Sequence, residues 1–303
     1  MRIVIVGQGP FGEKVLEALT KKGEDVVGVF TPPDKRGDAM NGLAEKSKIS
    51  FFRPARMKDP EVLPIFRELK PDLVVLAFVT DIIPERLLTV PSLGTICYHP
   101  SLLPRHRGAS GINWAIIQGD TQTGLTIFWV NQGIDTGPIL IQKEVEICPD
   151  DTTGSLYFNA LFPMGIDAIV EAVELIEKGK ATRNPQDESK ATYEPPCDDK
   201  VASVIFEKPI NEVYNLIRGC DPQPGAYTTF KGKKIRLYDA KMDPLASAKK
   251  PGEIVAIEEE GLQIAAKWGR IKIGKLRIDK GEKTEPLAFA RSVELRVGDR
   301  LGT

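Results

Sequence analysis

The chain of 303 residues has few of the residues that build metal sites and disulfide frameworks. It contains only two histidines, His99 and His106, and four cysteines that lie far apart and form no CxxC pair. Two histidines cannot build a histidine-rich zinc site, and the cysteine spacing matches no common metal-binding pattern. Scattered single cysteines are typical of reducing compartments, so we expect a cytoplasmic protein that binds no metal.

The sequence also lacks an excess of charge and long apolar runs. Lys and Arg together number 41 and Asp and Glu 42, which leaves a net charge of −1. This balance produces no global field that would attract nucleic acid, although it does not exclude a local basic patch. We find no apolar run of membrane-spanning length and no cleavable leader pattern at the N-terminus, and therefore expect no membrane partner.

Strands alternate with helices in the first part of the chain. Continuous apolar runs are typical of strands buried on both faces, and amphipathic stretches between them are typical of helices. The pattern predicts an α/β fold with a Rossmann-like, mostly parallel sheet. The expected strands are 3–6, 26–30, 73–78, 94–98, 125–130 and 139–147, and the expected helices are 11–21, 60–69, 84–88, 111–118 and a long one from about Asp151 or Thr153 to Gly179. Residues 31–42 are expected to form a loop.

The last third of the chain has a different pattern. Residues 181–209 show little periodicity and hold four prolines, which indicates a linker. After a short helix at 211–218, short strands with turns predict a smaller C-terminal β-barrel-like domain. These strands are expected at 226–230, 235–238, 252–257, 262–266 and 270–273. We therefore expect two domains, 1–200 and 205–303.

A glycine motif, GQGPFG at residues 7–12, lies between the first strand and the first helix. GxGxxG in this place can mark a dinucleotide site, with the pyrophosphate on the helix N-terminus. That interpretation requires an acidic residue about 20 positions on, at the end of the second strand. Asp34 lies beyond two prolines and is a poor candidate for a ribose ligand. The alternative is a tight turn without a ligand, and the motif alone leaves both open.

Two loops carry residues suited to proton transfer. His99 follows a predicted strand and begins a proline-stiffened loop, at the sheet edge where ligands of α/β proteins bind. It could act as an acid or stabilise an oxyanion, or it could merely tie the loop to backbone carbonyls. Asp135 lies between Gly133 and Gly137, which allow close approach of a ligand. An aspartate in an ordinary hairpin turn is the alternative.

These segments resemble a known family. HPSLLPRHRG at 99–108, GASGINWAIIQGD at 108–120 and GIDTGPILIQ at 133–142 are similar to the 10-formyltetrahydrofolate formyltransferases, and residues 217–240 resemble their C-terminal β-domain. VVGVFTPPDK at 26–35 and LFPMGI at 161–166 are most similar to the hydrolase domain of 10-formyltetrahydrofolate dehydrogenase. The resemblance implies an enzyme with the formyltransferase fold. Its substrate would be 10-formyltetrahydrofolate and its product tetrahydrofolate, without a metal or bound NAD.

The resemblance also implies roles for individual residues. His99 would donate a proton to the oxyanion or to the leaving folate N10, and Asp135 would hold the imidazole and help to deprotonate the nucleophile. Asp81, Ile82 and Ile83 match the segment that binds the pterin, largely through backbone groups. The glycine turn would be structural.

One position departs from the transferase pattern. Cys97 stands where the transferases have asparagine, which helps to bind the oxyanion, and where the hydrolase domain has an apolar residue. Because losing one oxyanion donor can cost about 10²–10³ in rate, Cys97 favours hydrolysis over amine transfer. Cys97 as a covalent nucleophile is a further interpretation, disfavoured because a buried thiol has a raised pKa.

The acceptor therefore has three candidates. Water is the first, with a partner or fused aldehyde dehydrogenase module. The second is charged tRNA on a basic face built from Lys231, Lys233, Lys234, Lys249 and Lys250. An amino sugar is the third. A folate-binding module without activity and a dinucleotide dehydrogenase are the alternatives outside formyl transfer.

Overall fold

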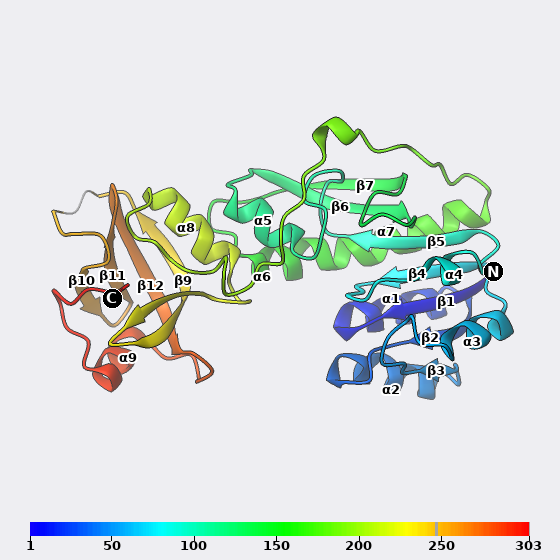
Figure 1. The fold of residues 1–303 in the computed structure, drawn as a ribbon, viewed down its shortest axis with the longest axis horizontal. Helices are drawn as coiled ribbons and strands as arrows, with labels where there is room; N and C mark the ends of the chain where they lie inside the picture. Colours follow the sequence, from blue (N-terminus) through cyan, green and yellow to red (C-terminus); the bar gives the residue numbers. More distant parts are fainter. Residues whose placement is uncertain (246–247, 303) are drawn as a thin grey trace. The chain divides into compact units, whose positions relative to one another are not determined.

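The computed structural model describes residues 1–245 and 248–302, and these form two compact units (Figure 1). Unit 1 consists of Met1–Gly111, Gly124–Val145 and Asn159–Glu194. Unit 2 consists of Ile112–Thr123, Glu146–Phe158 and the chain from Pro195 on. The chain therefore passes between the units several times. The division into domains 1–200 and 205–303 stays a prediction.

Unit 1 is built on a seven-stranded sheet of order β3-β2-β1-β4-β5-β6-β7. The first five strands of this order pair in parallel, and β6 pairs antiparallel with β5. This arrangement confirms the α/β, Rossmann-like and mostly parallel sheet. The strands are β1 (Arg2–Gly7), β2 (Asp25–Phe30), β3 (Phe51–Phe52), β4 (Leu73–Ala77), β5 (Gly94–His99), β6 (Gln122–Trp129) and β7 (Ile139–Glu146).

Helices bury both faces of the sheet because its strands carry apolar side chains in alternating directions. Val62 and Phe66 of α3 pack in one core cluster with Val4 and Val74 of the sheet. On α1, which packs against α7, Val15, Leu16 and Leu19 are fully buried. These helices are α1 (Gly9–Lys21), α3 (Val62–Leu69), α4 (Glu85–Leu88) and α7 (Phe162–Glu177). Helix α5 (Gly111–Ile117) belongs almost entirely to unit 2.

The prediction that 31–42 is a loop is wrong in its second half. A 3₁₀ turn, η1 (Lys35–Gly37), leads into helix α2 (Asp38–Lys46). The Asp34 side chain accepts a hydrogen bond from the Arg36 amide and so begins this turn. Met40 and Ala44 are fully buried on one side of α2. Such a short apolar face is too weak a periodic signal to outweigh the Pro, Gly and Asp residues around it.

A long helical stretch leads into the core of unit 1. It comprises α6 (Thr153–Leu156), the π-helical turn η2 (Tyr157–Leu161) and α7. Its N-cap is Thr152, which shares a capping box with Ser155 and lies between the two predicted caps. Contrary to expectation, its 25 residues are long and apolar enough to cross a membrane by length and composition. Core helices pass the same test, and in α7 Ala168 and Val173 are fully buried.

Unit 2 contains a five-stranded antiparallel sheet, where the sequence predicted a β-barrel-like domain of short strands. Its order is β10-β11-β12-β9-β8, and α8 and α9 cover its core. Val213 and Ile217 of α8 and Phe289 of α9 pack in one cluster with the sheet residues Leu237 and Ile273. Helix α9 was not predicted from the sequence. The elements are α8 (Ile210–Gly219), β8 (Ala226–Phe230), β9 (Lys233–Asp243), β10 (Ile254–Glu258), β11 (Gly261–Ala266), β12 (Gly269–Ile278) and α9 (Pro286–Val293).

A charge cluster in unit 2 makes its stability dependent on pH. The Asp199 carboxylate lies 2.7 Å from Nζ of Lys234 and 2.9 Å from Nη1 of Arg236. Hydrogen bonds from Arg236 and then Lys234 lower the pKa of Asp199 from 3.8 to about 2. Because the pKa is lower in the folded state, the cluster stabilises the fold above about pH 4. This contribution is lost as the pH falls towards 2.

We expect Asp199→Asn to lower the melting temperature by about 4 °C at pH 7, since a partly exposed pair contributes about 1 kcal/mol. The difference from the wild type should shrink as the pH falls from about 4 towards about 2. Thermal unfolding followed by circular dichroism at several pH values measures it. Asp25→Asn, which removes one exposed ion pair with Arg2, is the control and should leave the melting temperature unchanged. A constant difference down to the lowest pH would contradict the assignment.

Candidate active site

Hydrogen bonds to the neighbouring strands hold the loop after β5 in place. His99 ends β5, and the following residues are fastened to the neighbouring strands. The Leu103 amide donates to Oγ1 of Thr126 on β6, and Nε2 of Gln142 on β7 donates to the Leu103 carbonyl. The buried Ser101 hydroxyl donates to the carbonyl of Arg105 within the loop. These bonds anchor the loop, whose stiffness was predicted from its prolines.

The His99 ring is buried, with 6% of its surface exposed, and one of its nitrogens is committed to the backbone. Nε2 lies 2.8 Å from the carbonyl oxygen of His106, which adopts a left-handed conformation with φ of 56°. A carbonyl can only accept, so Nε2 carries a hydrogen. Nδ1 of neutral His99 therefore has a free lone pair. Proton transfer at this site would occur through Nδ1.

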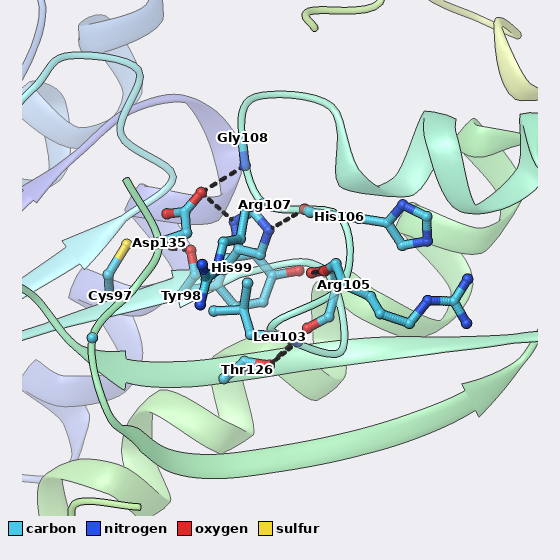
Figure 2. Close-up of polar contacts among 12 residues, drawn as sticks. Cys97, Tyr98, His99, Leu103, Arg105, His106, Arg107, Gly108, Thr126 and Asp135 are labelled. Carbon is cyan, nitrogen blue, oxygen red and sulfur yellow. Dashed lines mark hydrogen bonds and ion pairs between the residues drawn. The ribbon is translucent and has the colours of Figure 1, made fainter. Parts of the chain in front are cut away.

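Asp135 supplies the carboxylate that faces this nitrogen. Its Oδ2 lies 3.6 Å from Nδ1 of His99 and accepts a 2.8 Å hydrogen bond from the Gly108 amide. Figure 2 shows the carboxylate pointing between these two groups. Asp135 has a φ of 56°, a left-handed conformation that is uncommon outside glycine and often marks functional sites. The structure thus brings His99 and Asp135 together, 36 residues apart in sequence.

Cys97 lies beside this pair (Figure 2). Burial raises the pKa of the Cys97 thiol well above its usual range, and the charge of Asp135 raises it further. The thiol Sγ lies 3.5 Å from the carbonyl oxygen of Tyr98. Cys97 is therefore a protonated thiol at neutral pH, and this supports the expectation that it is not a nucleophile.

We expect Cys97→Ala to retain turnover within about threefold of the wild type, because a protonated, half-buried thiol contributes no nucleophile. Steady-state rates at saturating substrate measure this effect. Phe128, which faces Cys97 across the β5–β6 pair, offers a packing control, since Phe128→Leu changes volume without touching a thiol. Loss of more than about 100-fold in Cys97→Ala alone would point to covalent catalysis.

The predicted pterin segment lies after β4, the neighbour of β5 in the sheet. Asp81 accepts hydrogen bonds from the amides of Met57 and Ile82 and lines a cavity of about 330 Å³. Ile82 is 75% exposed, whereas Ile83 packs against the core. The cavity lining includes neither isoleucine and neither His99 nor Asp135. The pterin-binding role of the three residues stays a prediction.

The glycine motif borders the same cavity. Gly7 ends β1, Gly9 begins α1, and Gly7 and Gln8 line the cavity together with Thr31 and Asp34 from the end of β2. Asp34 is engaged with Arg36, whose hydrogen bonds lower the pKa of the Asp34 carboxyl. The acidic group is thus already paired, as expected of a poor ribose ligand.

Within 1–245 and 248–302, no cluster of three or more His, Cys, Asp or Glu could hold a metal ion.

A third segment of the site, residues 184–194, falls within the stretch that the sequence predicted to be a linker. Residues 184–194 belong to unit 1 and contact both loops of the site. Thr192 accepts from the amides of His106 and Arg107, through Oγ1 and the carbonyl oxygen respectively. Nε2 of Gln186 donates to the carbonyls of Asp135 and Gly137. The one signal for this segment in the sequence is Arg107, in the RHRG motif at residues 105–108. An arginine that becomes buried requires polar partners, but the sequence does not show where they are.

Comparison with known families gives two matches. The model described as formyl transferase matches residues 1–173, and the model described as formyl transferase, C-terminal domain, matches residues 198–294.

Two relatives illustrate the range of sequence similarity. The cytosolic 10-formyltetrahydrofolate dehydrogenase of Mus musculus is 42% identical over 270 residues, which is 83% of this chain. The alignment covers only 30% of that relative's length. The methionyl-tRNA formyltransferase of Geobacter metallireducens is 34% identical, over 100% of this chain and 99% of its own.

Solved structures share the fold. HypX from Aquifex aeolicus, solved in complex with tetrahydrofolic acid, superposes with a TM-score of 0.73 at 21% identity, over 98% of this chain and 48% of HypX. WlaRD, a sugar 3N-formyl transferase solved in the presence of dTDP and 5-N-formyl-THF, has a TM-score of 0.69 at 18% identity, over 90% and 97% of the two chains. At these identities the likeness shows the fold alone.

Proposed function

Because this chain belongs to the formyl transferase family of enzymes, we propose that it hydrolyses 10-formyltetrahydrofolate to formate and tetrahydrofolate. The observation that carries the proposal is the convergence of His99 and Asp135 at the end of β5. A cytoplasmic location is part of the proposal and rests on the sequence alone. The four cysteines of the chain are free thiols, which is consistent with a reducing compartment.

The proposed step adds water to an activated amide. The water oxygen bonds to the formyl carbon, and the carbonyl oxygen becomes the oxyanion of a tetrahedral intermediate. The bond to N10 then breaks, and N10 takes a proton as tetrahydrofolate leaves. His99 is placed to deliver that proton from Nδ1, since its Nε2 is held by the His106 carbonyl. Asp135 accepts the proton of the attacking water and passes it to Nδ1 of His99, whose protonated ring it stabilises, so both groups return to their starting state after N10 is protonated.

Two observations favour water over an amine as the acceptor. Cys97, a protonated thiol and a weak donor, stands where the transferases have an asparagine donor. The 42% identity to 10-formyltetrahydrofolate dehydrogenase exceeds the 34% identity to methionyl-tRNA formyltransferase. Since the chain spans about 30% of the dehydrogenase's length, a fused or associated aldehyde dehydrogenase module belongs to the proposal.

Methionyl-tRNA formylation is the second candidate, because the alignment with that relative covers both chains almost completely. The ion pairs on the proposed basic face of unit 2 weaken this candidate. Lys231, Lys234 and Lys249 lie 3.6, 2.7 and 2.8 Å from carboxylates of Glu294, Asp199 and Glu253. Paired lysines contribute less to the positive field that tRNA would require.

A product assay on 10-formyltetrahydrofolate tests the proposal. We expect tetrahydrofolate and formate in equal amounts with water alone, without NADP. Charged initiator tRNA and a nucleotide-linked amino sugar are supplied in parallel reactions. Tetrahydrofolate that appears only with one of these acceptors would reject hydrolysis and assign that acceptor, and a chain inactive with all three would reject formyl transfer.

A further inference from the structure

Arg107 is buried deeply for a charged residue and lies one position before the amide that binds Asp135. Its side chain has no exposed surface, and its guanidinium lies 2.7 Å from Oε1 of Glu188 and 2.6 Å from the Tyr193 hydroxyl. Nε and Nη2 of Arg107 also donate to Oε1 of Gln186, at 3.2 and 2.7 Å. A buried charge requires such partners, and here all of them come from the 184–194 segment.

The bond from Arg107 sets the direction of the Gln186 amide. With Oε1 occupied by the guanidinium, Nε2 must point to the opposite side. There it lies 2.8 Å from the carbonyl oxygen of Asp135 and 2.7 Å from that of Gly137. Both carbonyl oxygens can only accept a hydrogen bond. An amide with Oε1 towards Arg107 and Nε2 towards these carbonyls therefore satisfies all of these Gln186 contacts. A single side chain therefore clamps the backbone on both sides of Thr136.

The clamped turn has a strained backbone geometry. Asp135 adopts a φ of 56°, a conformation that costs free energy unless its surroundings hold it. Oδ2 of Asp135 reaches Gly108 N at 2.8 Å and His99 Nδ1 at 3.6 Å only while this turn keeps its place. A displacement of about 1 Å at a reacting group can cost up to about 100-fold in rate.

We propose that Gln186, oriented by Arg107, is a positioning residue that holds the Asp135 turn against the His99 loop. This inference rests on the proposed function of the site. Neither residue is placed against substrate. Through Gln186 alone, the 184–194 segment thus supports the Asp135 turn, and the rest of the segment has no assigned role in the reaction.

Gln186→Glu tests the inference with little change of shape. Its carboxylate still accepts from Arg107, but it has no hydrogen to donate and repels the two carbonyls. We expect kcat to fall about 10-fold, with KM within about twofold, while the variant stays fully folded at the assay temperature. In the Asp135→Asn background the same change should lower the residual kcat by less than about twofold, because the carboxylate it positions is absent.

Lys190→Ala is the matched control, since Lys190 lies in the same segment and is exposed and paired with Asp187. It should leave kcat unchanged. The inference is overturned if Gln186→Glu leaves kcat unchanged, raises KM instead, lowers activity only in proportion to the folded fraction, or acts equally in the Asp135→Asn background. A wild-type chain that releases no tetrahydrofolate would instead reject the proposed function, so the two failures are distinguishable.

Discussion

Replacing His99 with asparagine is expected to lower kcat for formate release by about 10³-fold. Asparagine is polar and fits the space but cannot exchange a proton, and general acid catalysis contributes about 10²–10⁴ in rate. The His106 carbonyl already holds Nε2, so the variant loses the one nitrogen that faces Asp135. Single-turnover measurement of tetrahydrofolate formation separates this chemical step from product release.

The Asp135→Asn variant and the double variant show whether the two residues act as a unit. Asp135→Asn alone should also cost about 10³-fold, since its amide cannot stabilise the imidazolium. The double variant should be little slower than either single one, because residues of one catalytic unit are strongly non-additive. If the rate losses of the two single variants multiplied in the double variant, the residues would act independently. That result would contradict the pairing at 3.6 Å. Far-ultraviolet circular dichroism should show the same fold for all three variants.

Gly137→Ala is expected to destabilise the protein by about 3 kcal/mol and to lower its melting temperature by about 10 °C. A Cβ atom at Gly137 would lie 1.6 Å from the carbonyl oxygen of Trp129 and 2.8 Å from its carbonyl carbon. These are rigid backbone atoms of β6, so the turn itself must move. Since Asp135 belongs to this turn, kcat should fall as well.

Gly42→Ala is the matched control for this substitution. Gly42 lies inside α2, and a Cβ built on it meets nothing within 4 Å. Alanine in a helix should stabilise the fold by about 0.5–1 kcal/mol, because the unfolded chain loses freedom. Calorimetry on both variants compares the addition of one methyl group at Gly137, where backbone atoms leave no room, with the same addition at Gly42, where space is open. Equal melting temperatures for the two variants would contradict the close approach at Gly137.

Some features of this protein were determined by its sequence alone. Continuous apolar runs such as Ile3–Val6 and Leu73–Ala77 are typical of strands buried on both faces, and they alternate with amphipathic helices. The mostly parallel sheet of unit 1 and the β-barrel-like character of the C-terminal domain were predicted from this local periodicity. The stiff loop after His99 followed from its prolines. All of these properties depend on neighbours in the chain.

Tertiary structure alone decided the distances and partners at the site. His99 faces Asp135 because β5 and the turn after β6 meet in space, and no local pattern encodes a distance of 3.6 Å. The role of residues 184–194 was hidden for the same reason. The segment has no regular period, so only contacts with Arg107 and with the Asp135 turn, 79 and 51 residues away, reveal its function. Side-chain hydrogen bonds between distant loops depend on the completed fold.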